Sequence, residues 1–181
     1  MEMEHLAHVL RAAKAITGET EFTIVGSQAV LAQHPDAPAA MKMSMEVDIF
    51  PRSRPDLSEL IEGALGAESH FHSTFGYHAD GIGEETAILP EGWEERAVVL
   101  DGHPLLEGAV AICPEIHDLC ASKLMAFREK DRTWVEAAVT AGLADPAKIA
   151  RRIDAMERDP EGAKGHASRW VKAMEFDSHA P

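Results

Sequence analysis

Hydrophobic residues in the first third of the chain follow helical spacing at first and then gather in short continuous runs. Leu6, Val9, Leu10 and Ala13 recur at the three- and four-residue intervals of an amphipathic helix. The short run Phe22–Val25 is typical of a buried strand instead. In chain order the pattern predicts a helix over residues 2–16 ended by Gly18, a strand over 21–25, a short helical run over 28–33, a loop over 35–44, a second strand ended by Pro51, and a helix over 57–65 with Asp56 as its N-cap.

The middle of the chain, residues 69–100, mixes short apolar runs with turn residues. It predicts a β meander in which FHSTFGYHADGI, TAIL and RAVVL supply the strands. Asp101-Gly102 is a hairpin-type turn signal that leads to a further strand over residues 109–113. Most of this region is therefore expected to be β structure.

The last third of the chain returns to helical periodicity. The predicted helices cover residues 115–128, 131–141, a stretch that begins at its N-cap Asp145, and 161–174, and the final residues 176–181 are predicted to be frayed. The element order predicts an α+β fold, in which a mixed sheet with flanking helices precedes a helical part. A chain of 181 residues fits one domain, with an α/β core over about 1–114 and the helical part over about 115–175.

Two acids lie one residue apart on the second predicted strand. Because side chains alternate along a strand, Glu46 and Asp48 point to one face, and Val47 and Ile49 point to the core. Adjacent carboxylates repel each other unless a cation lies between them, and Mg²⁺ prefers such oxygen ligands. The structural alternative is a pair of solvated acids on an edge strand.

The turn before these acids also has two interpretations. Gly26 lets the backbone approach a phosphate closely, and Ser27 could hydrogen-bond a phosphate oxygen. Ser27 could equally be the N-cap of the helical run that begins at Gln28. The two roles are compatible, because a helix N-terminus is itself an anion site.

Together these residues resemble the nucleotidyltransferase superfamily, whose members carry Gly-Ser or Gly-Gly after the first strand and Asp-x-Asp on the next. Gly26 and Ser27 stand at the first motif, and Glu46 and Asp48 at the second, with Glu in place of the usual first Asp. The resemblance implies a nucleotidyltransferase-like mixed sheet, an NTP substrate cradled by Gly26 and Ser27, and Mg²⁺ held by Glu46 and Asp48.

A second block, PEIHDLCASKLMAFREKDRTW, resembles the later motif of the AbiEii-type branch, the toxins of two-gene abortive-infection systems. In that branch a helical Lys precedes basic residues and an Asp, which here are Lys123, Arg128, Lys130 and Asp131. The resemblance implies that Lys123 and Arg128 bind the triphosphate. It implies that Asp131 activates an acceptor hydroxyl or holds a basic side chain in place. The structural alternative is a solvated face with local ion pairs.

The middle of the chain resembles a group of uncharacterised bacterial nucleotidyltransferase-like proteins, so that the whole resemblance covers residues 5–155. A third metal-binding carboxylate is usual in the superfamily, and Asp80 in GYHADGI is the candidate. Asp80 could instead be a turn residue, because Asp-Gly is a strong turn signal. Asp101 has the same two interpretations.

The histidines and cysteines point less clearly to a metal. His70 and His72 alternate on a predicted strand, with His78 nearby. Zinc would need three or four ligands, and Cys113 and Cys120 lack the spacing of a Cys-x-x-Cys pair. Structural or surface roles are therefore expected for the histidines.

A net charge of −14 argues against a broad nucleic-acid surface. Lys123, Arg128, Lys130 and Arg132 cluster within ten residues, and such a local basic patch suits a small anion such as a nucleotide. The acidic body would also suit a basic protein partner. The absence of a membrane-length apolar run or a leader sequence, together with two cysteines, predicts a cytoplasmic protein.

Three functional hypotheses follow. The first is an Mg²⁺-dependent enzyme that moves NMP from an NTP to a tRNA or protein acceptor, with Glu46, Asp48 and Asp80 as metal ligands. The resemblance further implies a two-gene toxin–antitoxin or phage-defence system with an antitoxin partner. The second, motivated by Glu46, is a catalytically degenerate fold that serves as a binding or regulatory module. The third is an unrelated α/β protein.

Overall fold

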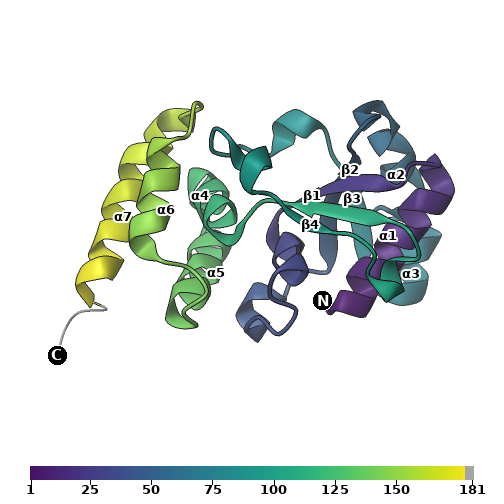
Figure 1. Ribbon diagram of the computed structural model, residues 1–181, viewed down its shortest axis with the longest axis horizontal. Helices are drawn as coiled ribbons and strands as arrows, with labels where there is room; N and C mark the ends of the chain where they lie inside the picture. Colours follow the sequence, from purple (N-terminus) through teal and green to yellow (C-terminus); the bar gives the residue numbers. More distant parts are fainter. Residues whose placement is uncertain (178–181) are drawn as a thin grey trace.

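The computed structural model describes residues 1–177, and side chains through residue 174. The helices are α1 (Met3–Thr17), α2 (Ser58–Leu65), α3 (His70–Phe75), α4 (Ile116–Ala126), α5 (Glu129–Thr140), α6 (Pro146–Asp154) and α7 (Ala163–Asp177). The strands are β1 (Glu21–Val25), β2 (Glu46–Pro51), β3 (His78–Gly81), β4 (Val98–Leu100) and β5 (Val110–Cys113). Helices α1, α2 and α3 lie at one end of the molecule and α4 to α7 at the other (Figure 1).

The five strands form one mixed sheet in the order β3-β2-β1-β5-β4. Strand β1 pairs antiparallel with β2 and parallel with β5, and β2 pairs parallel with β3. This arrangement confirms the predicted α+β class with a mixed sheet and a helical C-terminal part.

The hydrophobic core follows the alternation that the sequence predicted. Val47 and Ile49 of β2 are fully buried, as is Ile24 opposite Ile49 on β1. Leu10 of α1 and Ile61 of α2 are fully buried in the same core cluster. Burial of each such side chain stabilises the fold by about 1.5–3 kcal/mol. The core thus holds β2 in the orientation that sends Glu46 and Asp48 to its other face.

The prediction of a β meander over residues 69–100 was largely wrong. FHSTF forms helix α3, in which the Ser69 side chain accepts a hydrogen bond from the His72 backbone N–H. The rings of Phe71 and Phe75 lie 4.9 Å apart on this helix, which is the four-residue spacing of a helical pair. His70 and His72 therefore lie on a helix and not on a strand. TAIL forms no strand; β3 and β4, the latter within RAVVL, are the strands of this region.

Several predicted helix ends were also wrong. Helix α4 ends at Ala126 because Phe127 adopts a left-handed conformation (φ 50°), so that Arg128 becomes the N-cap of α5. Asp56 does not cap α2, since it lies in a short 3-10 turn and binds Arg54 instead. Asp145 does cap α6, as predicted, by accepting from the Ala147 backbone N–H at 2.8 Å.

The end of the chain is only partly described. Helix α7 runs to Asp177, so its backbone includes the first two residues that were predicted to be frayed. Residues 178–181 of the predicted frayed tail lie outside the described part. Among the helices within residues 1–177, none combines the length and apolarity needed to cross a membrane.

Candidate functional site

The pairing of β2 with β3 brings together four side chains that can bind a metal or a proton. The parallel register places Glu46 beside His78 and Asp48 beside Asp80. Side chains at paired positions share a face of the sheet, opposite the face that buries Val47. Asp80, the candidate third carboxylate, therefore lies next to the two predicted acids.

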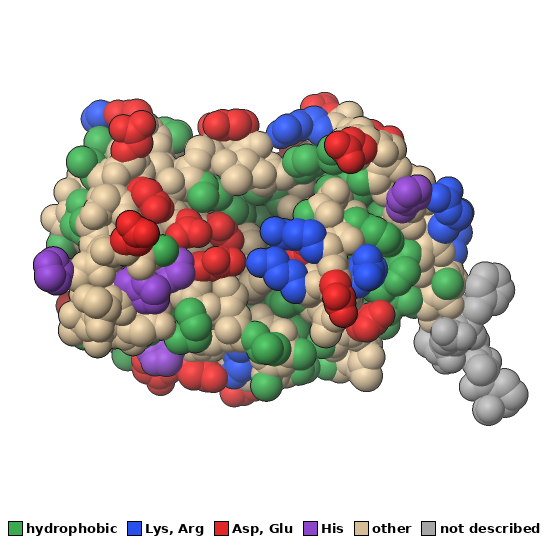
Figure 2. All heavy atoms as spheres, turned by 180° about the vertical axis from the view of Figure 1, so that it is seen from behind, with side chains coloured by type: hydrophobic (Ala, Val, Ile, Leu, Met, Phe, Trp, Pro, Cys, Tyr) green, Lys and Arg blue, Asp and Glu red, His purple; other side chains and the backbone are tan. Residues whose placement is uncertain are grey.

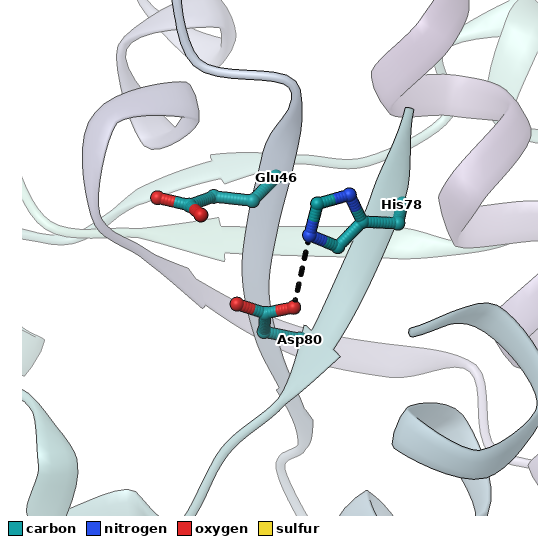
Figure 3. Close-up of side chains that lie close together, drawn as sticks. All are labelled: Glu46, His78 and Asp80. Carbon is teal, nitrogen blue, oxygen red and sulfur yellow. Dashed lines mark ion pairs between the residues drawn. The ribbon is translucent and has the colours of Figure 1, made fainter. Parts of the chain in front are cut away.

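Glu46, His78 and Asp80 converge most closely. One oxygen or nitrogen from each of the three side chains lies within 4.8 Å of the others. His78 Nε2 is 3.2 Å from Asp80 Oδ1, and the glutamate reaches the pair from the neighbouring strand (Figure 3). Glu46, whose side chain is 39% exposed, also lies 3.9 Å from Lys130 Nζ.

Asp48 lies against the turn that follows β1. Gly26 has φ 69° and ψ −159°, a region that only glycine adopts readily. A Cβ atom at Gly26 would lie 2.0 Å from Asp48 Oδ2, so the carboxylate occupies the space that a side chain would need. The conformation of the Gly26 turn and the position of the Asp48 side chain therefore depend on each other.

The electrostatic environment of Asp48 disfavours its charged form. Burial and the nearby carboxylates of Glu46 and Asp80 raise the pKa of Asp48 to about 6, and Lys123 opposes this rise. Burial also raises the pKa of Asp80. Burial favours the neutral form of these carboxyl groups. A bound divalent cation would instead favour their ionised form.

Lys123 crosses from α4 to the turn. Its Nζ donates to Ser27 Oγ at 2.8 Å and lies 3.6 Å from Asp131 Oδ1. It also lies 5.0 Å from the centre of the Trp134 ring. Burial lowers the pKa of Lys123, and Asp131 and Asp48 oppose that decrease. Gly26 is the N-cap of the helical run that follows, so Ser27 is not the N-cap that the sequence allowed.

Asp131 organises the basic side chains of this region. It is 1% exposed, and its carboxylate accepts from Arg128 Nε at 2.6 Å and from Arg128 Nη2 at 3.3 Å. A buried carboxylate between Arg128 and Lys123 fixes both cations at one edge of the site. Of the two roles that the resemblance implied for Asp131, this geometry matches the holding of basic side chains.

These groups border a cleft of about 480 Å³ between the sheet and the C-terminal helices. The residues that line it include Gly26, Asp48, Lys123, Arg128 and Asp131, and its apolar wall includes Val25, Ile82, Ile88, Met125 and Ala126. Figure 2 shows a group of acidic side chains facing a group of Lys and Arg side chains across the centre of this side of the molecule, with histidines beside the acidic group.

Sequence reasoning missed His78 as a member of the acidic group. The signal was present, because His78 precedes Asp80 by two residues and therefore shares its face on a strand. It was obscured by the expectation of a strand that carried His70 and His72. The apolar wall from Ile82 to Ile88 was also missed, since that segment was expected to be part of a meander.

Comparison with known proteins identifies the family of the chain. No curated protein and no solved structure matches it. A family model described as "Nucleotidyltransferase of unknown function (DUF6036)" matches residues 4–172, which include both the strand carboxylates and the basic segment of α4 and α5. The chain therefore belongs to this nucleotidyltransferase family.

Proposed function

We propose that this protein transfers a nucleoside monophosphate from an NTP to an acceptor hydroxyl, with release of pyrophosphate. The observation that supports this most directly is that Asp48, Lys123 and Arg128 line the same cleft, so that one ligand can meet a carboxylate and two cations. Such an arrangement suits a metal-bound triphosphate, which needs both anionic ligands for the metal and cations for the phosphates.

The residues present fit a divalent cation. Glu46, Asp48 and Asp80 offer the hard oxygen ligands that Mg²⁺ prefers. Burial, and after it the charges of Glu46 and Asp80, raise the pKa of Asp48, and a bound cation would oppose both effects. These three residues would hold Mg²⁺, which supplies charge neutralisation and polarisation of the phosphate when bound.

The remaining groups bind and orient the nucleotide in this proposal. Lys123 and Arg128 neutralise phosphate oxygens in the cleft that the Gly26 turn also lines. Asp131 keeps the two cations in place. The apolar wall that includes Ile82 and Ile88 takes the base or ribose.

The acceptor is proposed to be an RNA, such as a tRNA end, or a protein hydroxyl. We further propose a cytoplasmic protein that acts as the toxin of a two-gene system with an antitoxin partner. The resemblance of residues 114–134 to the AbiEii-type motif supports this part of the proposal.

The test is transfer of label from α-³²P NTPs to RNA and protein acceptors in the presence of Mg²⁺. Transfer should occur with the wild-type chain, should be lost in Asp48→Asn and should persist in a control variant, Arg54→Ala, whose ion pair with Asp56 is exposed. Unchanged transfer in Asp48→Asn would refute the proposed site. If calorimetry shows NTP binding but no acceptor is labelled, the chain is a degenerate binding module instead.

A further inference from the structure

The acidic group contains one ligand that is not an oxygen. His78 directs Nε2 toward Asp80, two residues later on β3, and an oxygen of Glu46 on β2 lies within 4.8 Å of both side chains (Figure 3). The carboxylate of Asp48 does not belong to this group. The group therefore marks a position beside the one that Asp48 and the Gly26 turn define.

The imidazole is held in place before any metal arrives. The parallel register fixes His78 and Glu46 as neighbours, and the side chain of His78 is only 13% exposed. The ring of His72 lies 4.6 Å from that of His78 and packs against it. Within the described residues, Nδ1 of His78 is buried and has no hydrogen-bond partner, so an ion pair with Asp80 accounts for only one of its two nitrogens.

The donor distances suit a transition metal with a small adjustment. Nitrogen and oxygen ligands lie about 2.0–2.2 Å from a metal such as Zn²⁺, so two donors in a tetrahedral site are about 3.4 Å apart. Donors that lie within 4.8 Å of one another therefore have to approach each other by at most about 1.4 Å, which rotation of the side chains can supply. Two carboxylates and a neutral imidazole also carry a formal charge of −2, which Lys130 offsets only in part at 3.9 Å from Glu46.

We propose that Glu46, Asp80 and Nε2 of His78 form a binding position for a divalent transition metal, and that His78 makes this position prefer Mn²⁺ or Zn²⁺ to Mg²⁺. Imidazole nitrogen binds first-row transition ions well, whereas Mg²⁺ prefers oxygen. The inference rests on the proposed function in that Glu46 and Asp80 are shared with the proposed Mg²⁺ site. It assigns the site a metal selectivity that the carboxylates alone would not provide.

Mn²⁺ provides a direct spectroscopic test. The full chain is titrated with MnCl₂, and pulsed electron paramagnetic resonance is used to detect ¹⁴N coupling from a directly bound imidazole. The coupling should be present, should change to that of ¹⁵N in chain labelled with ¹⁵N-histidine, and should vanish in His78→Ala. His166→Ala is the matched control, because His166 is exposed on α7, outside the acidic group. The labelled wild-type chain shows whether a histidine binds the metal, and His78→Gln assigns that histidine if His78→Ala does not fold.

Affinity gives the second measurement. His78→Ala should weaken Mn²⁺ binding by about tenfold or more, as loss of a metal ligand or its support does, while Mg²⁺ affinity changes much less. Bound Mn²⁺ without nitrogen coupling, or equal losses for both ions, would overturn the inference and leave the proposed transferase intact. If neither ion binds, with or without NTP, the inference and the proposed function both fail.

Discussion

Gly26 and Asp48 depend on each other at the level of single atoms. The glycine has a conformation in which a side chain is strained, and the place of that side chain is already taken by Asp48 Oδ2. Gly18 offers a comparison, because it also has a positive φ of 76°, but a Cβ atom added there would meet no other atom within 4 Å. Gly18 thus shows the cost of a left-handed backbone alone, whereas Gly26 combines a less accessible ψ of −159° with the steric conflict.

We expect Gly26→Ala to destabilise the protein by about 3 kcal/mol or more, since backbone strain and overpacking each cost about 1–3 kcal/mol. Gly18→Ala should cost only about 1–2 kcal/mol, the usual penalty for a left-handed alanine. Urea unfolding monitored by circular dichroism measures both. Equal losses in the two variants would mean that Asp48 moves aside at little cost.

The raised pKa of Asp48 makes stability depend on pH. Because the folded-state pKa of about 6 exceeds the unfolded value of about 3.8, the folded protein binds the proton more tightly than the unfolded chain does. The protonated carboxyl therefore contributes fully to the free energy of unfolding below pH 4, and this contribution is lost as pH rises through 6. This shift corresponds to about 3 kcal/mol at most.

Asp48→Asn should accordingly stabilise the metal-free protein at pH 8 by about 1–3 kcal/mol, with the gain disappearing below pH 4. Thermal and urea unfolding across pH 4–8 in the presence of EDTA would measure the difference. Asp36→Asn makes the same change at an exposed position and serves as the control variant. A stability difference for Asp48→Asn that stays constant with pH would contradict the raised pKa of Asp48.

At the scale of elements, Asp118 joins parts of the chain that are distant in sequence. It is 0% exposed in the first turn of α4 and accepts two hydrogen bonds of 3.0 Å from Arg96. Arg152 of α6 contributes an ion pair of 2.9 Å to the same carboxylate. The Asp118 carboxylate therefore connects the segment before β4 with α4 and α6.

Removal of the Asp118 carboxylate should lower the free energy of unfolding substantially. We expect Asp118→Ala to destabilise the protein by about 3–5 kcal/mol, because it leaves two partly buried guanidinium groups without their anion. Glu94→Ala, which removes the exposed partner of Arg52 at 3.4 Å, should cost less than about 1 kcal/mol. Chemical denaturation gives both values, and similar small losses would show that water replaces the Asp118 carboxylate.

The sequence predicted elements best where one local pattern decided the structure. The alternation of β2 sent Val47 to the core and Glu46 to the other face, and Asp145 marked the start of α6. The sequence could not predict contacts that depend on tertiary packing, such as the hydrogen bond from Lys123 to Ser27, which lie 96 positions apart. Phe127 shows the same limit, because an apolar residue at helical spacing gave no sign of the left-handed turn that ends α4.

At the scale of the whole molecule, a net charge of −14 contrasts with a small basic area beside the cleft. The most exposed cations there are Arg128 and Lys130, with side chains 60% and 65% exposed. Each already lies near an acid, Asp131 and Glu46 respectively. An RNA acceptor would therefore meet few free cations before it met a repulsive surface.

We expect single-stranded RNA to bind weakly and with little dependence on salt. Each phosphate neutralised on a single strand contributes about −0.7 to the slope of log K against log salt, so two cations predict a slope of about −1.4. Fluorescence anisotropy with a short labelled RNA at several salt concentrations would measure this slope, and Arg128→Ala together with Lys130→Ala should bring it near zero. A slope steeper than about −4 would require a basic surface larger than this one. Such a slope would favour an RNA acceptor over a protein acceptor, because it would show that the net negative charge of the protein does not prevent RNA from binding.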